Sequence, residues 1–320
     1  GAKGFAFLNM LQLIGWTSIM IYDAMLALQE LAPLSPIIWT TAIGALVILW
    51  LFIGLHNTGY IQAIVSVLLL GLTIYMGAHM IAQWPSESSF VASGNMSFMA
   101  ALELSIAMPL SWLPLISDYT RESKQPFSAS LTSTTVYTVT SIVMYTLGLS
   151  AAIFGGGDSI ITIMMNAGLG LAGLIVIIFS TVTTTFMDAY SAGVSSTTIY
   201  SRASSKGVAV IVTIIGTIAA ILYPMDDITD FLYLIGSVFT PMIAILLADY
   251  FINRQQVQTL SAYLVRGLIW ALSVGLYHYM LHSESTIGAT LPAFTMAFII
   301  TAIVGFISKT VNSSVEIKEH

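Results

Sequence analysis

Long apolar stretches alternate along this chain with short polar ones. A helix needs about 20 apolar residues to cross the hydrocarbon core of a bilayer, because it rises 1.5 Å per residue. Ten stretches reach or approach that length. The predicted spans are Phe5–Leu28, Pro36–Leu55, Tyr60–Ala82, Phe98–Ile116, Ser128–Phe154, Leu169–Ala192, Val208–Tyr223, Phe231–Phe251, Tyr263–His282 and Ile287–Ile307. The pattern predicts an all-α polytopic membrane protein with one transmembrane domain over residues 1–320.

Composition and charge agree with this prediction. The chain is 57% hydrophobic and 8% charged, whereas a soluble domain is about 25% charged. It contains no cysteine, which excludes disulfides and thiolate metal sites. If the N-terminus is cytoplasmic and the spans alternate, all nine Lys and Arg residues fall on the cytoplasmic side. By the positive-inside rule this predicts ten spans in the cell membrane with both termini cytoplasmic.

The fourth predicted span breaks the rules of an ordinary membrane helix. Pro109 and Pro114 bracket Ser111 and Trp112 within six residues. Proline lacks the backbone N–H and clashes with the carbonyl four residues earlier, so we expect the helix to break here. Broken helices in the membrane interior mark the substrate sites of many transporters, and a Trp offers a flat face to a flat ligand. The alternative is an ordinary proline kink with an aromatic filler.

Two further spans carry polar groups that are costly in lipid. In the first span, Gln12 and Trp16 lie four residues apart and share a helix face. They suit a planar ligand, although Gly15 and Ser18 equally suit plain helix packing. In the sixth span, the hydroxyl groups around Ser180 precede Asp188.

The hydroxyls of Thr183 and Thr184, next to Ser180, suit a hard cation such as Na⁺, which prefers neutral oxygen ligands. Asp188 lies one turn beyond Thr184 on the same helix face, and its expected partners are these hydroxyls, a ligand N–H or a transported proton. The alternative is that these Thr side chains bond back to carbonyls of their own helix, as they commonly do.

The remaining ionisable residues give weaker indications. Glu103 in the fourth span suits a gate or proton site as well as it suits the interface, and the interface is the simpler reading for Asp23. The His278 and His282 pair lies near a helix end, where interfacial placement is favoured over metal binding. No nucleophile–base pair and no Walker, Rossmann or HExxH pattern stands in its required context. We therefore expect no enzyme, catalytic residue, metal or organic cofactor, and no nucleic-acid partner.

Several motifs resemble a known transporter family. SWLPLISDYTR (residues 111–121) resembles the sixth-helix motif of the nucleobase–cation symporter family one, and TTTFMDAYSAG (183–193) resembles its eighth helix. PMIAILLADYF (241–251) resembles the tenth helix, and the Gly15–Trp16 pair resembles the third-helix GW. The sequence of the sixth-helix motif is most similar to that of CytX-type transporters, which are associated with hydroxymethylpyrimidine.

The resemblance implies a LeuT-like fold, in which family helices 1–5 and 6–10 form inverted repeats and two more helices follow. The ten predicted spans would be family helices 3–12. The first two family helices would then be absent, and the domain would be N-terminally incomplete. Since the first family helix contributes to both the substrate and the cation site, this chain alone would be an inactive fragment.

The resemblance also implies roles for single residues. Trp16 and Trp112 would sandwich a flat ring, with the small Ser111 beside them and Gln12 as a polar neighbour. The family's polar partner one turn after the first Trp falls on Met20, so that contact would be lost. The family's substrate amide falls at or beside Asp188 and Ala189, where an acid would accept from the N–H groups of an aminopyrimidine. The cation site would fall on three residues, Ser180 (carbonyl), Thr183 and Thr184 (hydroxyls).

The function expected from these features is secondary transport by alternating access. The substrate would be a small planar pyrimidine, hydroxymethylpyrimidine, and the coupling ion Na⁺ or H⁺. A cytosine, purine or hydantoin permease of the same family is the alternative. A channel and an intramembrane enzyme are the rivals of a different class, and the residues favour neither.

Overall fold

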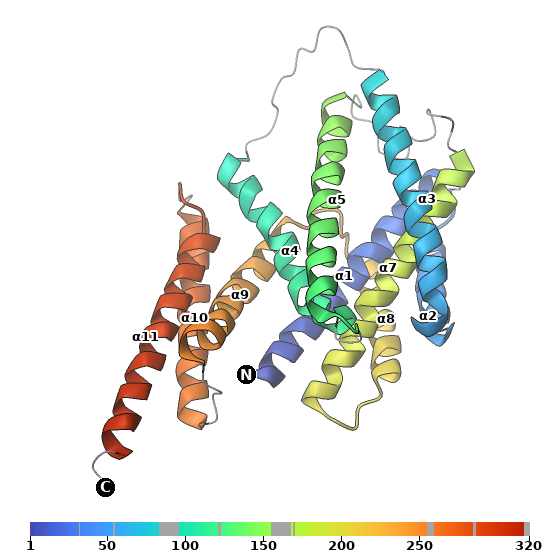
Figure 1. The fold of residues 1–320 in the computed structure, drawn as a ribbon. Helices are drawn as coiled ribbons and strands as arrows, with labels where there is room; N and C mark the ends of the chain where they lie inside the picture. Colours follow the sequence, from blue (N-terminus) through green and yellow to red (C-terminus); the bar gives the residue numbers. More distant parts are fainter. Residues whose placement is uncertain are drawn as a thin grey trace. The chain divides into compact units, whose positions relative to one another are not determined.

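The computed structural model describes residues 1–31, 33–53, 55–82, 96–120, 123–154, 168, 170–254, 259–283 and 286–316. All regular structure in these ranges is helical (Figure 1). The helices are α1 (Ala2–Leu31), α2 (Pro36–Ile53), α3 (Leu55–Ala82), α4 (Phe98–Thr120), α5 (Pro126–Phe154), α7 (Gly170–Ile199), α8 (Ser205–Leu222), α9 (Thr229–Leu247), η1 (Ala248–Asn253), α10 (Leu260–His282) and α11 (Thr290–Glu316).

Each predicted span is occupied by a helix. Over the described residues, nine helices are long and apolar enough to cross a membrane. The remaining predicted span coincides with α5, whose 29 residues exceed the length that a bilayer requires. The main differences lie at the ends, because polar residues such as Ser195 to Thr198 extend α7 beyond the apolar run. The prediction of an all-α polytopic membrane protein is confirmed.

The predicted break in the fourth span is wrong. α4 is one continuous helix from Phe98 to Thr120, with Pro109 and Pro114 inside it. Each proline removes one N–H donor, and the neighbouring residues keep their helical conformation. The Ser111 hydroxyl, between the two prolines, donates to the Met108 carbonyl oxygen at 2.6 Å. The helix continues past both prolines without unwinding.

The eighth predicted span contains a feature that the pattern did not indicate. α9 continues directly into the π-helical segment η1, in which the Arg254 N–H donates to the Asp249 carbonyl oxygen at 2.8 Å. The segment ends at Arg254, whose φ of 48° is left-handed. Short π-helical segments are rare and often occur at functional positions.

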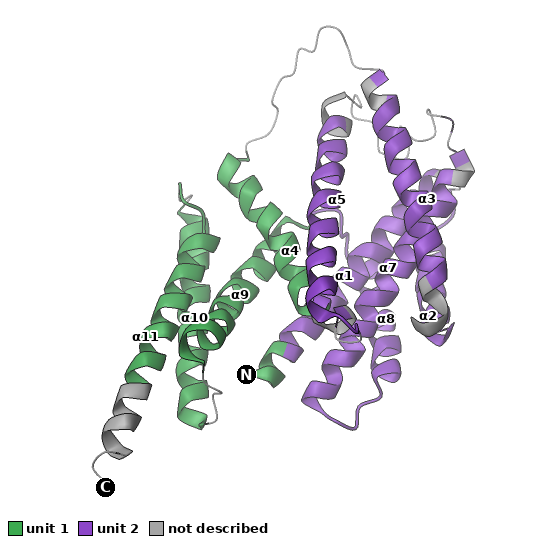
Figure 2. Cartoon of the chain, in the orientation of Figure 1, with its two compact units in different colours: residues 1–5, 94–115, 228–320 green, residues 6–93, 116–227 purple. Residues whose placement is uncertain are grey.

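The helices form two compact units (Figure 2). Unit 1 comprises residues 1–5, 94–115 and 228–320, and therefore most of α4 together with α9, η1, α10 and α11. Unit 2 comprises residues 6–93 and 116–227, and therefore most of α1 together with α2, α3, α5, α7 and α8.

Unit 2 is held together by close approaches at small residues. α8 packs against α7 and α2, and α7 packs against α2 and α3. A Cβ atom on Gly216 of α8 would lie 2.7 Å from the Cγ2 atom of Thr17 in α1. One on Gly44 of α2 would clash with the Thr217 hydroxyl. Small residues let helix backbones approach closely where lipid supplies no hydrophobic driving force, so these glycines fix how α1, α2 and α8 pack.

Unit 1 is built on the mutual packing of α9, α10 and α11. Ala244, Ile269 and Ala297, one from each helix, form a buried cluster. A second cluster joins Tyr277 of α10 to Ala289 and Ala293. The small residues of α9 and α11 leave room for the large side chains of α10.

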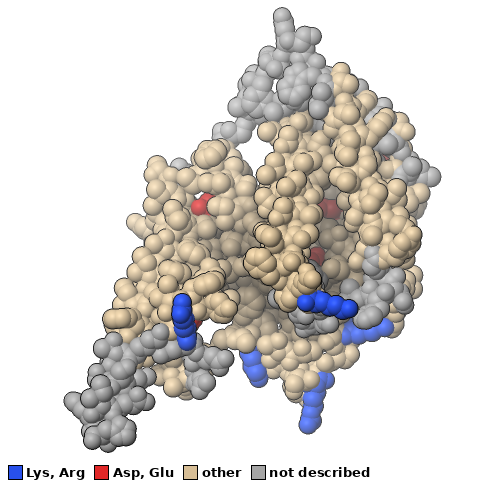
Figure 3. Space-filling model, viewed as in Figure 1, with Lys and Arg blue, Asp and Glu red and all other residues tan. Residues whose placement is uncertain are grey.

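The outer surface is apolar, as a lipid environment requires. Large hydrophobic residues such as Phe52, Ile74 and Leu264 are exposed. Figure 3 shows that charged atoms occupy little of the face in view. In a soluble protein, apolar surface on this scale would be an aggregation hazard.

We predict that Gly216→Ala destabilises the protein, because the added methyl group forces α8 away from Thr17. Overpacking of this kind costs about 1–3 kcal/mol. The matched control is Gly71→Ala in α3, where a Cβ atom meets nothing within 4 Å. Both changes raise helix propensity, so the difference in thermal midpoint in detergent isolates the clash. Equal midpoints would contradict the packing described for α1 and α8.

Candidate functional site

The centre of unit 2 contains a polar connection between α1 and α7. The Asn9 amide nitrogen donates to the Ser195 hydroxyl oxygen at 2.9 Å, and the Gln12 amide nitrogen donates to the Asn9 amide oxygen at 2.7 Å. Asn9 and Gln12 are both buried. The connection fixes the register of two antiparallel helices (Figure 1) and holds Gln12 in place.

Trp16 and Asp188 are equally spaced along their helices from the Asn9–Ser195 hydrogen bond. Trp16 lies seven residues after Asn9 and Asp188 lies seven residues before Ser195. Seven residues are close to two full helical turns, about 10 Å along the axis. Both side chains are partly buried.

Asp188 differs from the other acids inside the helices. It is partly buried, and no hydrogen bond or ion pair links its carboxylate to another described residue. A carboxylate away from water is costly unless it has a partner. The neighbouring Ala189 is fully buried, so its side chain packs against protein.

The three residues expected to bind a cation lie on a single turn of α7. The Thr183 and Thr184 hydroxyl groups both donate to the Ser180 carbonyl oxygen at 2.9 Å. Thr183 is buried and Thr184 is exposed. These are the hydrogen bonds to a carbonyl of the same helix that the alternative interpretation expects. They also place three neutral oxygen atoms within one turn.

Ser111 and Trp112 belong to unit 1. Ser111 is buried, and Trp112 is partly exposed. Arg121, the last residue of the sixth-helix motif, lies outside the described residues. The stacking of one ring between Trp16 and Trp112 stays a prediction.

The ionisable residues that the sequence indicated more weakly lie in different environments in the structure. Asp23 is exposed, in agreement with the simpler reading. Glu103 is buried and hydrogen-bonded to α10, α11 and the residue before α11. The His282 ring contacts the carbonyl of His278 at 2.7 Å, which is a contact within one helix turn. In the part of the chain that the structure describes, no three His, Cys, Asp or Glu residues gather as a metal site.

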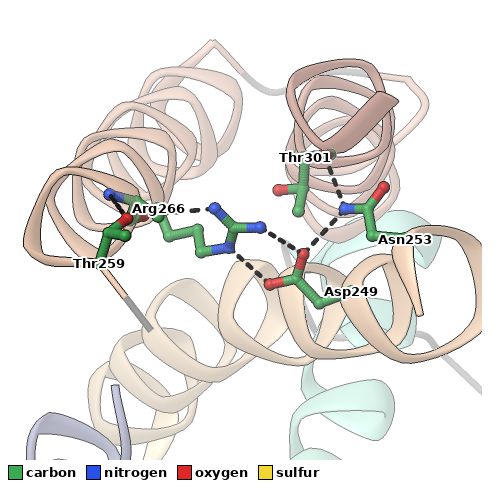
Figure 4. A network of polar contacts seen from close by, with 6 residues as sticks. Asp249, Asn253, Thr259, Arg266 and Thr301 are labelled. Carbon is green, nitrogen blue, oxygen red and sulfur yellow. Dashed lines mark hydrogen bonds and ion pairs between the residues drawn. The ribbon is translucent and has the colours of Figure 1, made fainter. Parts of the chain in front are cut away.

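Sequence reasoning missed a polar network in unit 1 (Figure 4). Arg266 of α10 binds Asp249 of η1 through two hydrogen bonds, Nε to Oδ2 at 2.6 Å and Nη2 to Oδ1 at 2.7 Å. The Asn253 amide donates to Asp249 Oδ1 at 2.8 Å and to the Thr301 carbonyl at 3.1 Å. The available indication was that Asp249 and Arg266 stand at facing ends of two consecutive spans. The network joins η1, α10 and α11.

The sequence model of a family described as a permease for cytosine/purines, uracil, thiamine and allantoin matches residues 4–317. The chain belongs to this permease family. It is therefore a multi-pass membrane transporter and not an enzyme. A search of curated proteins gave no match.

The fold of this permease is similar to that of a solved transporter. The structure of Mhp1, a nucleobase-cation-symport-1 family transporter in a closed conformation with bromovinylhydantoin bound, matches with a TM-score of 0.72. The alignment covers 97% of this chain and 76% of Mhp1, at 14% sequence identity. The LeuT-like transporter fold expected from the sequence is confirmed by this match.

We predict that Asn9→Ala and Ser195→Ala are coupled, because each removes one end of the α1–α7 connection. A double-mutant cycle on the free energy of unfolding should give a coupling energy of about 0.5–1.5 kcal/mol. The control pair is Asn9→Ala with Thr213→Ala, since the Thr213 hydroxyl bonds to Ala209 of its own helix. Additive effects in both pairs would contradict the α1–α7 connection.

Proposed function

We propose that this permease is a cation-coupled symporter that imports a small planar pyrimidine, hydroxymethylpyrimidine. The observation that carries the proposal is the Asp188 carboxylate, which has no hydrogen-bond partner among the described residues. It lies two helical turns from the Asn9–Ser195 hydrogen bond, as Trp16 does on α1. A ligand with N–H donors and a flat ring complements both groups. Membership of a permease family for cytosine, purines, uracil and thiamine supports a substrate of this size and shape.

Asp188 favours an aminopyrimidine over a ring without donors. An ionised carboxylate accepts hydrogen bonds and donates none. Hydrogen bonds to a charged group contribute about 1.5–3 kcal/mol, more than a neutral amide would give. An exocyclic amino group beside a ring nitrogen offers the required N–H, whereas a ring edge made of carbonyl oxygens would repel the carboxylate.

Trp16 supplies the second part of the proposed site. An indole ring beside an acid gives one apolar face and one polar edge, which are the two requirements of a flat heterocycle. Trp112 would cover the other face of the ring, as the resemblance implies.

The turn from Ser180 to Thr184 would hold the coupling ion. When both hydroxyl groups donate to the Ser180 carbonyl, their oxygen atoms keep lone pairs that can bind a cation. Hard cations take oxygen ligands from several groups at once, so elements outside α7 would complete the coordination. The neutral ligands favour Na⁺ over a proton.

We predict that Asp188→Asn reduces uptake of labelled hydroxymethylpyrimidine at least about tenfold at low substrate concentration, which equals roughly 1.4 kcal/mol of lost interaction. The measurement is initial uptake by cells that express the protein from its complete gene. The control is Asp23→Asn, which neutralises an exposed acid on α1 and should leave uptake unchanged. Equal uptake by both variants at equal expression would overturn the role of Asp188.

We predict that Thr183→Val and Thr184→Val each raise the Na⁺ concentration needed for half-maximal uptake about tenfold or more, because valine keeps the shape and removes the ligand oxygen. Thr185→Val is the matched control. Its hydroxyl is buried and bonds to the Thr181 carbonyl at 2.8 Å, so it should leave the Na⁺ dependence unchanged. Uptake that follows a pH gradient and ignores Na⁺ would replace Na⁺ by H⁺.

A further inference from the structure

We infer that the Glu103 side chain anchors α4 to the N-terminal end of α11 and thereby positions Trp112. The role of Trp112 in this inference rests on the proposed function. The anchor itself rests on contacts within unit 1 alone.

Glu103 is surrounded by hydrogen-bond donors. Its side chain is 4% exposed. Oε1 accepts from the Ala289 N–H at 2.9 Å and from the Thr290 N–H at 3.1 Å, and Oε2 accepts from the same Thr290 N–H at 3.1 Å. The hydroxyl groups of Thr290 and Tyr277 also donate to Oε2, the latter at 3.4 Å. Both carboxylate oxygens are thus satisfied without water.

Backbone N–H groups can only donate, so both Glu103 oxygens act as acceptors toward the Ala289 and Thr290 N–H groups. Thr290 is the first residue of α11. The first N–H groups of a helix have no partner within the helix and carry partial positive charge. Glu103, from another helix, supplies the acceptor that a capping side chain would otherwise provide.

Gly288 makes this close approach possible. Its φ of 73° lies in the left-handed region, which side chains rarely adopt. A Cβ atom on Gly288 would also clash with Glu103 Oε1. The turn before α11 is therefore shaped around the carboxylate.

The anchor controls the direction in which Trp112 points. Trp112 lies nine residues after Glu103 on a continuous helix, which is about 13 Å along the axis and roughly half a turn around it. The two side chains therefore lie on opposite faces of α4. Fixing Glu103 against α10 and α11 sets both the rotation and the axial position of α4, and so the orientation of Trp112.

The first test measures the anchor without any substrate. The chain has no cysteine, so Ala289→Cys provides a single thiol at a buried position, and Ser283→Cys provides an exposed one. We expect Ala289→Cys to resist a membrane-impermeant maleimide in the parent protein and to react at least about tenfold faster when Glu103→Gln is added. Ser283→Cys should react equally in both backgrounds. Continued protection of Ala289→Cys would overturn the anchor.

The second test measures positioning. In folded, purified protein from the complete gene, Glu103→Gln should weaken hydroxymethylpyrimidine binding about tenfold, and it should have no further effect in a Trp112→Ala background. Glu103→Asp, which keeps the charge, should recover part of the affinity. An equal loss in both backgrounds would contradict a role through Trp112.

A failure of the proposed function can be distinguished from a failure of the Glu103 anchor. If the parent protein binds no planar heterocycle, the proposed function is wrong, and the labelling rates still decide whether Glu103 anchors α11. If Glu103→Gln does not fold, Tyr277→Phe removes one donor from the same carboxylate and should give a smaller increase in labelling of Ala289→Cys. No increase in that variant would count against the anchor.

Discussion

The structure depends on one constraint: a carboxylate inside a membrane protein must have partners, because lipid offers none. Glu103 and Asp249 satisfy this constraint within the protein. Glu103 accepts from the first N–H groups of α11, and Asp249 pairs with Arg266 and Asn253. Asp188 lies in a helix of the same kind, and no described residue pairs with its carboxylate. The proposed function gives this carboxylate a partner from outside the chain, the substrate.

The two units differ in how their helices are joined. In unit 1 both acids tie helices together, at the N-terminal end of α11 and around η1. In unit 2 the helices are joined by small residues and by the neutral hydrogen bond between Asn9 and Ser195. None of these contacts involves the Asp188 carboxylate, so the described packing of unit 2 does not depend on it.

Most of the fold could be predicted from the sequence, because span length and hydropathy are local properties. The break in α4 could not, because proline identity shows which donors are lost and not whether the surrounding helix tolerates the loss. In the structure α4 stays continuous through both prolines. The π-helical segment η1 was missed for the opposite reason, because Asp249 finds its partner 17 residues later, on another helix.

The candidate site was predictable residue by residue and not as an arrangement. Trp16 and Asp188 each stood out as unusual in an apolar span. The Asn9–Ser195 hydrogen bond, which ties their helices together, joins residues 186 positions apart and could not be predicted from local spacing. Glu103 shows most clearly what the sequence alone cannot predict. An acid in a span suits a gate, a proton site or an interface equally well until the groups that donate hydrogen bonds to it are known.

The central claim is that Asp188 binds the N–H edge of the substrate. It is tested most directly by the affinity of the purified protein for hydroxymethylpyrimidine and for an analogue with hydrogen in place of the amino group. The parent protein should prefer the amino compound by about tenfold or more, since a hydrogen bond to a charged group contributes at least roughly 1.5 kcal/mol. Asp188→Asn should lose most of this preference while it still binds the analogue. An unchanged preference in Asp188→Asn would contradict the account.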